Sequence, residues 1–324
     1  MTSVRTVASE QKLPLVVEAL PGNGAGPEAL LRYYQVNFDL IESKLLEHGA
    51  ILFRGFGIVQ EEIFQQTVRS SLFGRMLDYV DGNSPRTKVT SGVYTSTEYP
   101  PEFFISMHNE LSYSERWPAR LFFCCVVVPE EGGETPLADS RAILGGMRSD
   151  LVDKFTQNGV KYIRNLHGGR GYGPSWQKTF ETEDRTAVEE YCRDSGIQLE
   201  WKPDGGVRLW HVRPATATHP KTGEAVWFNQ ADQFHPSTHP PKIYESLKAL
   251  YKGKEAQMPQ NAVFGDDTPI EDWMLDEVRE TTRREIRLFP WQQGDFLMVD
   301  NMLVCHGRMP FKGPRKILVS MTNT

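Results

Sequence analysis

The feature that most constrains this chain is a pair of metal-binding side chain types, His108 and Glu110, separated by one residue. On an extended backbone the side chains at positions i and i+2 leave the same face, so this imidazole and this carboxylate can reach one ion together. A second histidine, His306, directly follows an apolar strand-like run near the other end of the chain. If all three bind one ion, the fold must bring the two segments together.

Two histidines and one carboxylate form the ligand set of non-haem Fe(II) oxygenases, which leaves coordination positions for substrate and oxygen. The His-x-Glu spacing alone is weak evidence, because a satisfied strand histidine beside a surface acid is an ordinary arrangement. Two further features support a site. Arg315 opens the last apolar strand and suits an anionic co-substrate, and Gly132-Gly133 suits a tight turn before Thr135, whose hydroxyl can donate to the same anion.

Composition excludes several classes of partner. The 324 residues carry 36 basic and 42 acidic side chains, for a net charge of −6, and the cations are scattered, so no nucleic-acid partner is expected. The N-terminus lacks a signal-peptide pattern, and the longest apolar run, residues 121–128, is too short to span a bilayer. The four cysteines show neither zinc spacing nor a disulfide framework, which favours a reduced, cytoplasmic protein.

The pattern predicts short strands separated by turns, with helices mainly early and late. Helices are expected at residues 27–48, 60–70, 150–158, 183–195 and 271–284. Strands are expected at 51–54, 121–128, 160–164, 198–202, 207–212, 215–218 and 225–229, with others starting at Ile286, Phe296 and Arg315. This order indicates a mainly β, α+β fold: a sandwich or barrel with helical decoration.

No repeat or linker divides the sequence, so residues 1–324 are predicted to form a single domain, with an insertion around 231–269 near the mouth of the site. Residues 79–98 are predicted as a loop with an edge strand, or alternatively as a lining of the substrate pocket. The glycine-rich loop 167–174 is predicted as a solvent loop, with a lid as the alternative. Four other histidines suggest a second metal site, but proline follows three of them, so ordinary loop histidines are predicted: His211, His219, His235 and His239.

At these residues the chain resembles the Fe(II)/2-oxoglutarate dioxygenases of the TauD/TfdA superfamily, in the taurine dioxygenase and clavaminate-synthase-like group. The similarity rests on His108-x-Glu110, on Gly-Gly-x-Thr135, on Asp300-Asn301 leading to His306-Gly-Arg308, and on Arg315. It extends over most of the chain and implies a double-stranded β-helix, or jelly roll. In having Glu rather than Asp at position 110, the chain resembles the branch that contains bacterial amino-acid hydroxylases of natural-product pathways.

The resemblance implies Fe(II) held by His108, Glu110 and His306, with 2-oxoglutarate and O2 as co-substrates. It places the distal carboxylate of 2-oxoglutarate on Arg315 and Thr135, with Arg308 as the other candidate arginine. The expected reaction is hydroxylation of an aliphatic carbon of an amino acid or an amino-acid-derived small molecule. Polar groups proposed for substrate binding are Asn109, Ser112, Tyr113 and Arg86.

Several alternatives stay open at this stage. The same cofactor chemistry can give desaturation or epoxidation, and the substrate can be a sulfonate or an aminoacyl group tethered to a carrier protein. Two other classes use the same ligands: a non-catalytic metal-binding jelly roll, and a zinc hydrolase that activates water. Arg315 and Thr135 argue against the non-catalytic jelly roll, since a mere metal-binding barrel needs no matched anion site. No membrane partner is expected, and the oligomeric state is left open.

Overall fold

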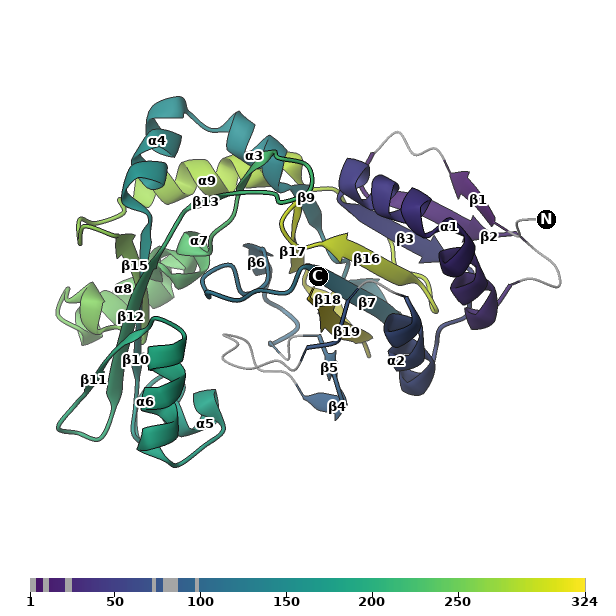
Figure 1. Ribbon diagram of the computed structural model, residues 1–324. Coiled ribbons are helices and arrows are strands. Elements are labelled where there is room, and N and C mark those ends of the chain that lie inside the picture. The colour runs from purple at the N-terminus through teal and green to yellow at the C-terminus, as the bar shows by residue number, and fades with distance from the viewer. Residues whose placement is uncertain are drawn as a thin grey trace.

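An eight-stranded sheet forms the main layer of the computed structural model, which describes residues 4–7, 12–20, 25–71, 74–77, 87–96 and 99–323 (Figure 1). Its strand order is β1-β2-β3-β16-β7-β19-β5-β4. The strands are β1 (Val4–Val7), β2 (Leu15–Ala19), β3 (Ala50–Arg54), β4 (Lys88–Thr90), β5 (Val93–Thr95), β7 (Arg120–Val127), β16 (Phe296–Asp300) and β19 (Lys316–Thr322). Segments from both ends of the chain therefore share one sheet.

Strand β7 lies between β16 and β19 and is covered on both faces. Cys124 packs with the cluster on one face and Cys125 with the cluster on the other, as expected for neighbours on a strand. The continuous apolar run at residues 121–128 correctly predicted that β7 is buried on both faces.

Helices α1 (Pro27–His48) and α2 (Glu61–Ser70) cover one face of the main sheet (Figure 1). The buried side of α1, which includes Tyr34 and Leu45, packs in the same cluster as Phe53 and Phe296. Pro27 suits the first turn of α1, because a backbone N–H at that position would have no partner within the helix. Gly49 ends α1 in the left-handed conformation and donates its N–H to the Leu45 carbonyl at 2.6 Å.

A smaller antiparallel sheet faces the other side of the main sheet. It contains β6 (Ile105–His108), β17 (Val304–Arg308) and β9 (Leu137–Asp139) in that order, and a two-stranded ribbon of β8 (Glu131–Gly132) and β18 (Phe311–Lys312) lies beyond it. Apolar side chains such as Leu121, Phe123 and Val304 fill the space between the two sheets. This two-sheet arrangement confirms the predicted jelly roll.

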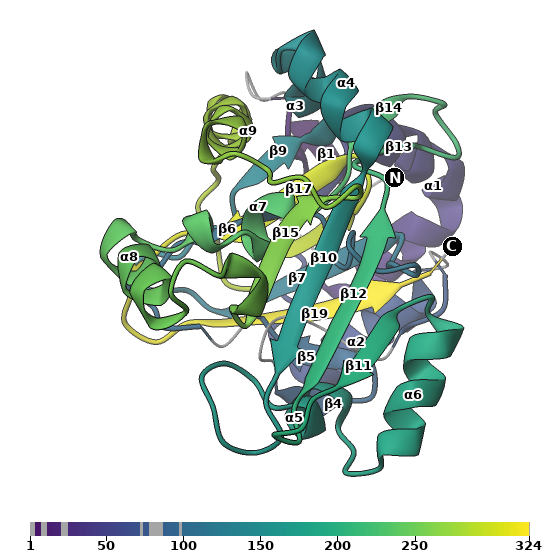
Figure 2. The same ribbon diagram turned by 90° about the vertical axis from the view of Figure 1, so that its left-hand side faces the viewer.

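A second lobe is built on the four-stranded sheet β11-β12-β10-β15 (Figure 2). These strands are β10 (Val160–Leu166), β11 (Gln198–Trp201), β12 (Val207–Arg213) and β15 (Gln260–Phe264). The remaining elements are α3 (Ser140–Gly146), α4 (Ser149–Asn158), α5 (Trp176–Phe180), α6 (Arg185–Asp194), β13 (Thr216–Thr218), β14 (Ala225–Trp227), α7 (Ala231–Phe234), α8 (Pro241–Leu250) and α9 (Asp272–Glu285), with 3-10 turns at Pro236–Thr238 and Glu255–Gln257.

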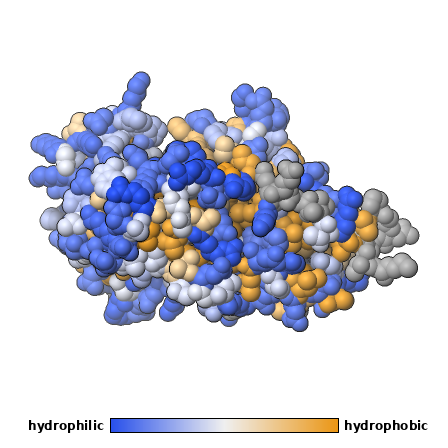
Figure 3. All heavy atoms as spheres, turned by 90° about the horizontal axis from the view of Figure 1, so that it is seen from above, coloured by the Kyte–Doolittle hydropathy of each residue, from blue (hydrophilic) through white to orange (hydrophobic). Residues whose placement is uncertain are grey.

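Polar residues cover most of the face seen in Figure 3, and hydrophobic residues gather mainly near its middle. None of the described helices combines the length and apolar character that crossing a bilayer requires.

Most predicted elements are confirmed within two or three residues, and three differences stand out. The strand predicted from Ile286 is wrong, since only an isolated bridge joins Arg287 to Leu137; Pro290 follows and has no N–H to continue a ladder. Helix α5 was not predicted, because it spans only five residues. Within residues 231–269, β15 pairs with β10, so the end of this segment belongs to the second sheet.

Replacing Gly49 with alanine is expected to destabilise the fold through two separate costs. A Cβ at this position would lie 2.3 Å from Cγ2 of Val304 on β17, and φ is +76°. The left-handed backbone costs roughly 1–2 kcal/mol for a residue with a Cβ, and overpacking adds about 1–3 kcal/mol.

Gly57→Ala is the matched control, because φ is +66° there and nothing lies within 4 Å of the added Cβ. Urea denaturation should give a larger loss of unfolding free energy for Gly49→Ala than for Gly57→Ala. Equal losses would show that the contact with Val304 is relieved at no cost.

Candidate active site

The pairing of β6 with β17 brings the two predicted histidines together. His108 lies directly opposite His306 in this antiparallel pair, so both side chains leave the same face. Their ring centroids are 4.4 Å apart, and Oε2 of Glu110 lies 3.9 Å from Nε2 of each. All three residues are buried, and their ligand atoms lie within 4.8 Å of one another.

Glu110 reaches this cluster differently from the prediction. Strand β6 ends at His108, and Glu110 lies in the turn that follows, where Leu111 adopts a positive φ of 55°. The carboxylate is therefore placed by a turn, and strand alternation alone does not explain its direction.

Hydrogen bonding orients His108 as a metal donor. Its Nδ1 lies 2.8 Å from the carbonyl oxygen of Ser106, and this contact requires a proton on Nδ1. The lone pair of a neutral ring is then on Nε2, the atom that faces Glu110. Two imidazoles and a carboxylate, buried at this spacing, fit the donor set of a 2-His-1-carboxylate Fe(II) site.

A small cavity of about 30 Å³ connects both histidines with the proposed anion site. Thr135 and Arg315 line it together with His108 and His306. The open space between the two histidines and Arg315 is thus small in this conformation.

Arg315 is held by Gly133 and Ser96. Its Nε donates to the Gly133 carbonyl at 2.9 Å, and its Nη1 donates to the Ser96 hydroxyl at 3.0 Å. A Cβ at Gly133 would meet Arg315 Cδ at 3.1 Å and Pro129 Cγ at 2.7 Å, which explains why glycine stands here.

Burial, followed by the nearby charge of Arg308, lowers the pKa of Arg315 to about 10. Among the described residues, no carboxylate forms an ion pair with Arg315. This half-buried cation suits an incoming anion.

Arg308 makes a different set of contacts, although it also lines the small cavity. Its Nη1 donates to the Tyr99 carbonyl, and its Nη2 donates to the carbonyls of Pro100 and Phe103, at 2.7 to 3.0 Å. Arg308 thus fixes the segment that leads into β6. Its planar, multi-donor guanidinium suits this backbone clamp.

Two of the residues predicted to bind substrate contact other parts of the structure in this conformation. Asn109 donates from Nδ2 to the Ser140 hydroxyl and the Asn301 carbonyl. Tyr113 packs against Phe234 at 4.9 Å between ring centroids, and Ser112 is buried beside it. Arg86 lies outside the described residues. Their roles in substrate binding stay predictions.

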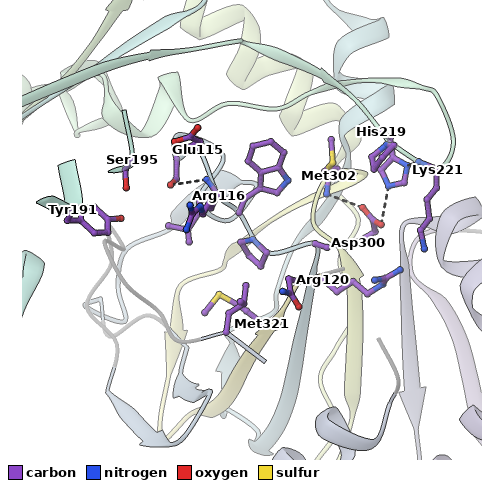
Figure 4. Close-up of a pocket in the computed structure, with 18 residues that line it drawn as sticks. Glu115, Arg116, Arg120, Tyr191, Ser195, His219, Lys221, Asp300, Met302 and Met321 are labelled. Carbon is purple, nitrogen blue, oxygen red and sulfur yellow. Dashed lines mark hydrogen bonds and ion pairs between the residues drawn. The ribbon is translucent and has the colours of Figure 1, made fainter. Parts of the chain in front are cut away.

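Two larger cavities lie near the cluster. One, of about 560 Å³, is lined by His108 and Asn109 and by residues of α7 and α9. The other, of about 750 Å³, adjoins the turn after Glu110 and is lined by Leu111, Trp117 and Tyr191 (Figure 4). Both volumes are in the range of small-ligand sites.

The other histidines form ordinary contacts. His219 points at the Asp300 carboxylate (Figure 4), and the two lie 3.3 Å apart. His211 contacts the Tyr113 carbonyl at 2.7 Å, and His235 contacts the Ser237 hydroxyl at 2.8 Å. Within the described part of the chain, His108, Glu110 and His306 form the one cluster of metal-binding type.

One functional candidate was missed at the level of sequence. Asn301 was noted there only as part of a motif, yet it is completely buried and bonds to the backbone of Glu110. The available signal was a polar residue between two apolar runs just before His306.

Comparisons with known proteins agree with this geometry. Residues 17–322 match the family model "Taurine catabolism dioxygenase TauD, TfdA family". The dapdiamide synthesis protein DdaC of Enterobacter agglomerans is 38% identical over 281 residues, covering 87% of this chain and 84% of that protein. A clavaminate synthase-like protein of Arabidopsis thaliana is 34% identical over 294 residues, covering 87% and 83%.

Among solved structures, PvcB of Pseudomonas aeruginosa superimposes with a TM-score of 0.57 at 14% identity, covering 99% of this chain and 92% of that one, which shows a shared fold. The match to the family model spans nearly the whole chain and includes both segments that carry the His, Glu and His cluster. The chain therefore belongs to the TauD/TfdA family of Fe(II)- and 2-oxoglutarate-dependent oxygenases.

Proposed function

We propose that this oxygenase hydroxylates an aliphatic carbon of an amino acid or an amino-acid-derived small molecule in a natural-product pathway. The observation that carries the cofactor part of this proposal is the buried cluster of His108, Glu110 and His306 beside the cation of Arg315. The substrate part is supported by similarity to DdaC, which is described as a dapdiamide synthesis protein. When bound, Fe(II) supplies oxidation of an unactivated C–H bond by O2, coupled to conversion of 2-oxoglutarate to succinate and CO2.

In this proposal the cluster holds the metal and leaves the other coordination positions open. His108 and His306 bind through Nε2 and Glu110 binds through its carboxylate. The contact between His108 Nδ1 and the Ser106 carbonyl keeps the donor nitrogen directed at the ion.

Thr135 and Arg315 hold the far carboxylate of 2-oxoglutarate. Thr135 Oγ1 accepts the indole N–H of Trp291 at 3.3 Å, so its own proton is directed to another acceptor. A charge-assisted hydrogen bond from Arg315 fixes the orientation of the co-substrate.

A zwitterionic substrate requires both signs of charge around it, because a buried unpaired charge is costly. The 560 Å³ cavity that His108 lines contains both, in Asp232 and Arg279, whose carboxylate and guanidinium lie 2.6 Å apart. These two residues already pair with each other, so a zwitterion bound there would have to replace both partners of this ion pair.

Alanine in place of His108, Glu110 or His306 is expected to abolish metal binding and oxidation while leaving a folded protein, because each change removes a ligand outside the apolar core. Anaerobic addition of Fe(II) and 2-oxoglutarate should give the visible charge-transfer band of the chelate only with the unchanged protein. His235→Ala is the matched control, since it removes a buried histidine outside the cluster whose ring bonds to Ser237 and lies 3.8 Å from the Asp272 carboxylate. Full activity in Glu110→Ala would contradict the ligand assignment.

Arg315→Gln is expected to weaken 2-oxoglutarate binding by roughly 1.5–3 kcal/mol, the value of a hydrogen bond to a charged group. The affinity for the metal alone should stay unchanged, which isothermal titration can check. Arg308→Gln should instead lower thermal stability, because three backbone carbonyls lose their donor. The opposite pattern, with 2-oxoglutarate affinity lost only in Arg308→Gln, would identify Arg308 as the anion-binding arginine.

A succinate-release screen tests the substrate class. Free amino acids and carrier-bound aminoacyl groups are compared with sulfonates and aryloxyacetates, and mass spectrometry reads a gain of one oxygen. Substrate-dependent succinate with an amino acid and a product heavier by one oxygen is the expected result. Loss of two hydrogens would indicate desaturation, and turnover of only a sulfonate or an aryloxyacetate would overturn the amino-acid proposal.

A further inference from the structure

The peptide unit of Glu110 is held by a single side chain from another part of the fold. Asn301 lies in the turn between β16 and β17, at 0% exposure. Its Oδ1 accepts the backbone N–H of Glu110 at 2.7 Å, and its Nδ2 donates to the backbone carbonyl of the same residue at 2.9 Å. One amide thus satisfies both hydrogen-bonding groups of the residue that carries the carboxylate.

Asn301 also closes the loop that follows Glu110. Its Nδ2 donates to the Pro118 carbonyl at 2.8 Å, and its backbone N–H donates to the Ala119 carbonyl at 3.0 Å. Its own carbonyl accepts Nδ2 of Asn109 at 2.7 Å. Both ends of the segment 109–119 are therefore fixed to this one residue.

The sheet alone does not supply this support. Strand β6 is an edge strand of its sheet, and it ends at His108, before Glu110. On the β6 side, two amides of the α7 segment contact the same stretch: Gln233 donates to the Ser106 carbonyl at 3.2 Å and Gln230 to the Asn109 carbonyl at 2.7 Å. Asn301 differs from these amides in bonding to both the N–H and the carbonyl of Glu110 itself.

Asn301 is joined directly to the strand of the other ligand, because the turn continues through Leu303 into β17 and His306. We propose that Asn301 is a positioning residue that sets the Glu110 carboxylate relative to His306, and that a neutral side-chain amide is required there. A metal site tolerates deviations of only about 0.2 Å in its ligand distances. A turn containing the positive φ of Leu111 does not hold that geometry without support.

The neighbouring charges explain why aspartate is a poor substitute. Asp300 already caps the turn, since its Oδ1 accepts the N–H groups of Met302 and Leu303, and its Oδ2 faces His219. An aspartate at 301 could accept the N–H of Glu110. It could not donate to the carbonyls of Glu110 and Pro118, and it would add a second buried carboxylate beside Asp300.

The test compares Asn301→Asp, Asn301→Ser and Asn301→Ala with Asn165→Ala. Asn165 is the matched control, because its buried amide donates to two carbonyls, those of Ala256 and Met258, in the second lobe. Mn(II) alone is the probe, read by electron paramagnetic resonance of the free ion, and Co(II) absorption reports the coordination geometry. Thermal unfolding of each variant measures stability separately.

The Asn301 variants are expected to lose Mn(II) affinity by about 10- to 100-fold, the range for residues that orient metal ligands, and to show an altered Co(II) spectrum. Asn165→Ala should lower thermal stability without changing either metal readout. Folded Asn301 variants with unchanged Mn(II) affinity and Co(II) spectrum would overturn the inference. The inference would also be overturned if the metal affinity of Asn301→Ser, the mildest change, fell only in proportion to its loss of thermal stability.

The inference rests on Glu110 being a metal ligand, and Glu110→Ala in the same Mn(II) titration separates the two claims. If Glu110→Ala keeps full affinity, the ligand assignment fails. If Glu110→Ala loses affinity and the Asn301 variants do not, the assignment stands and the positioning role of Asn301 is wrong.

Discussion

The metal-binding cluster depends on one strand pairing, the antiparallel contact between β6 and β17 that sets His108 opposite His306. A slip of one residue in this pairing would turn one of the two histidines to the other face of the sheet. Strand β17 is held on its other side by β9, and the apolar layer that includes Phe123 and Val304 packs it toward the main sheet. The register of two short strands is thus secured by the core of the whole jelly roll.

The anion pocket shows how this fold combines stability with binding. Arg315 is half-buried and has no carboxylate partner among the described residues, so the partial loss of solvent disfavours its charge and lowers its pKa. A bound carboxylate would offset this effect, so the co-substrate should stabilise the folded protein by mass action. Arg308, close to Arg315, has its donors directed at three backbone carbonyls instead. Two arginines in one cavity therefore have different tasks, one in binding and one in holding the chain.

Close contacts of the backbone, made possible by glycine, are as important for the geometry of the site as side-chain chemistry. Gly49 lets the end of α1 contact Val304, and Gly133 lets its turn approach Arg315. Beyond the end of β6, side-chain amides replace the strand partners: Asn301 bonds to the backbone of Glu110, and Gln230 bonds to the carbonyl of Asn109. The site is precise because rigid strands, close-packed turns and these amides restrict the same few residues.

Local patterns in the sequence determined the elements and the chemistry. Pro27 and Gly49 marked both ends of α1, the apolar run around Cys124 predicted a doubly buried strand, and His108, Glu110 and His306 were recognised as a ligand set. Only the tertiary structure decided which arginine holds the chain, that Glu110 lies in a turn, and that Asn301 contacts it. These outcomes depend on hydrogen bonds between residues far apart in the chain, and hydrophobic periodicity carries no information about such partners, because it reports only which face of an element is buried.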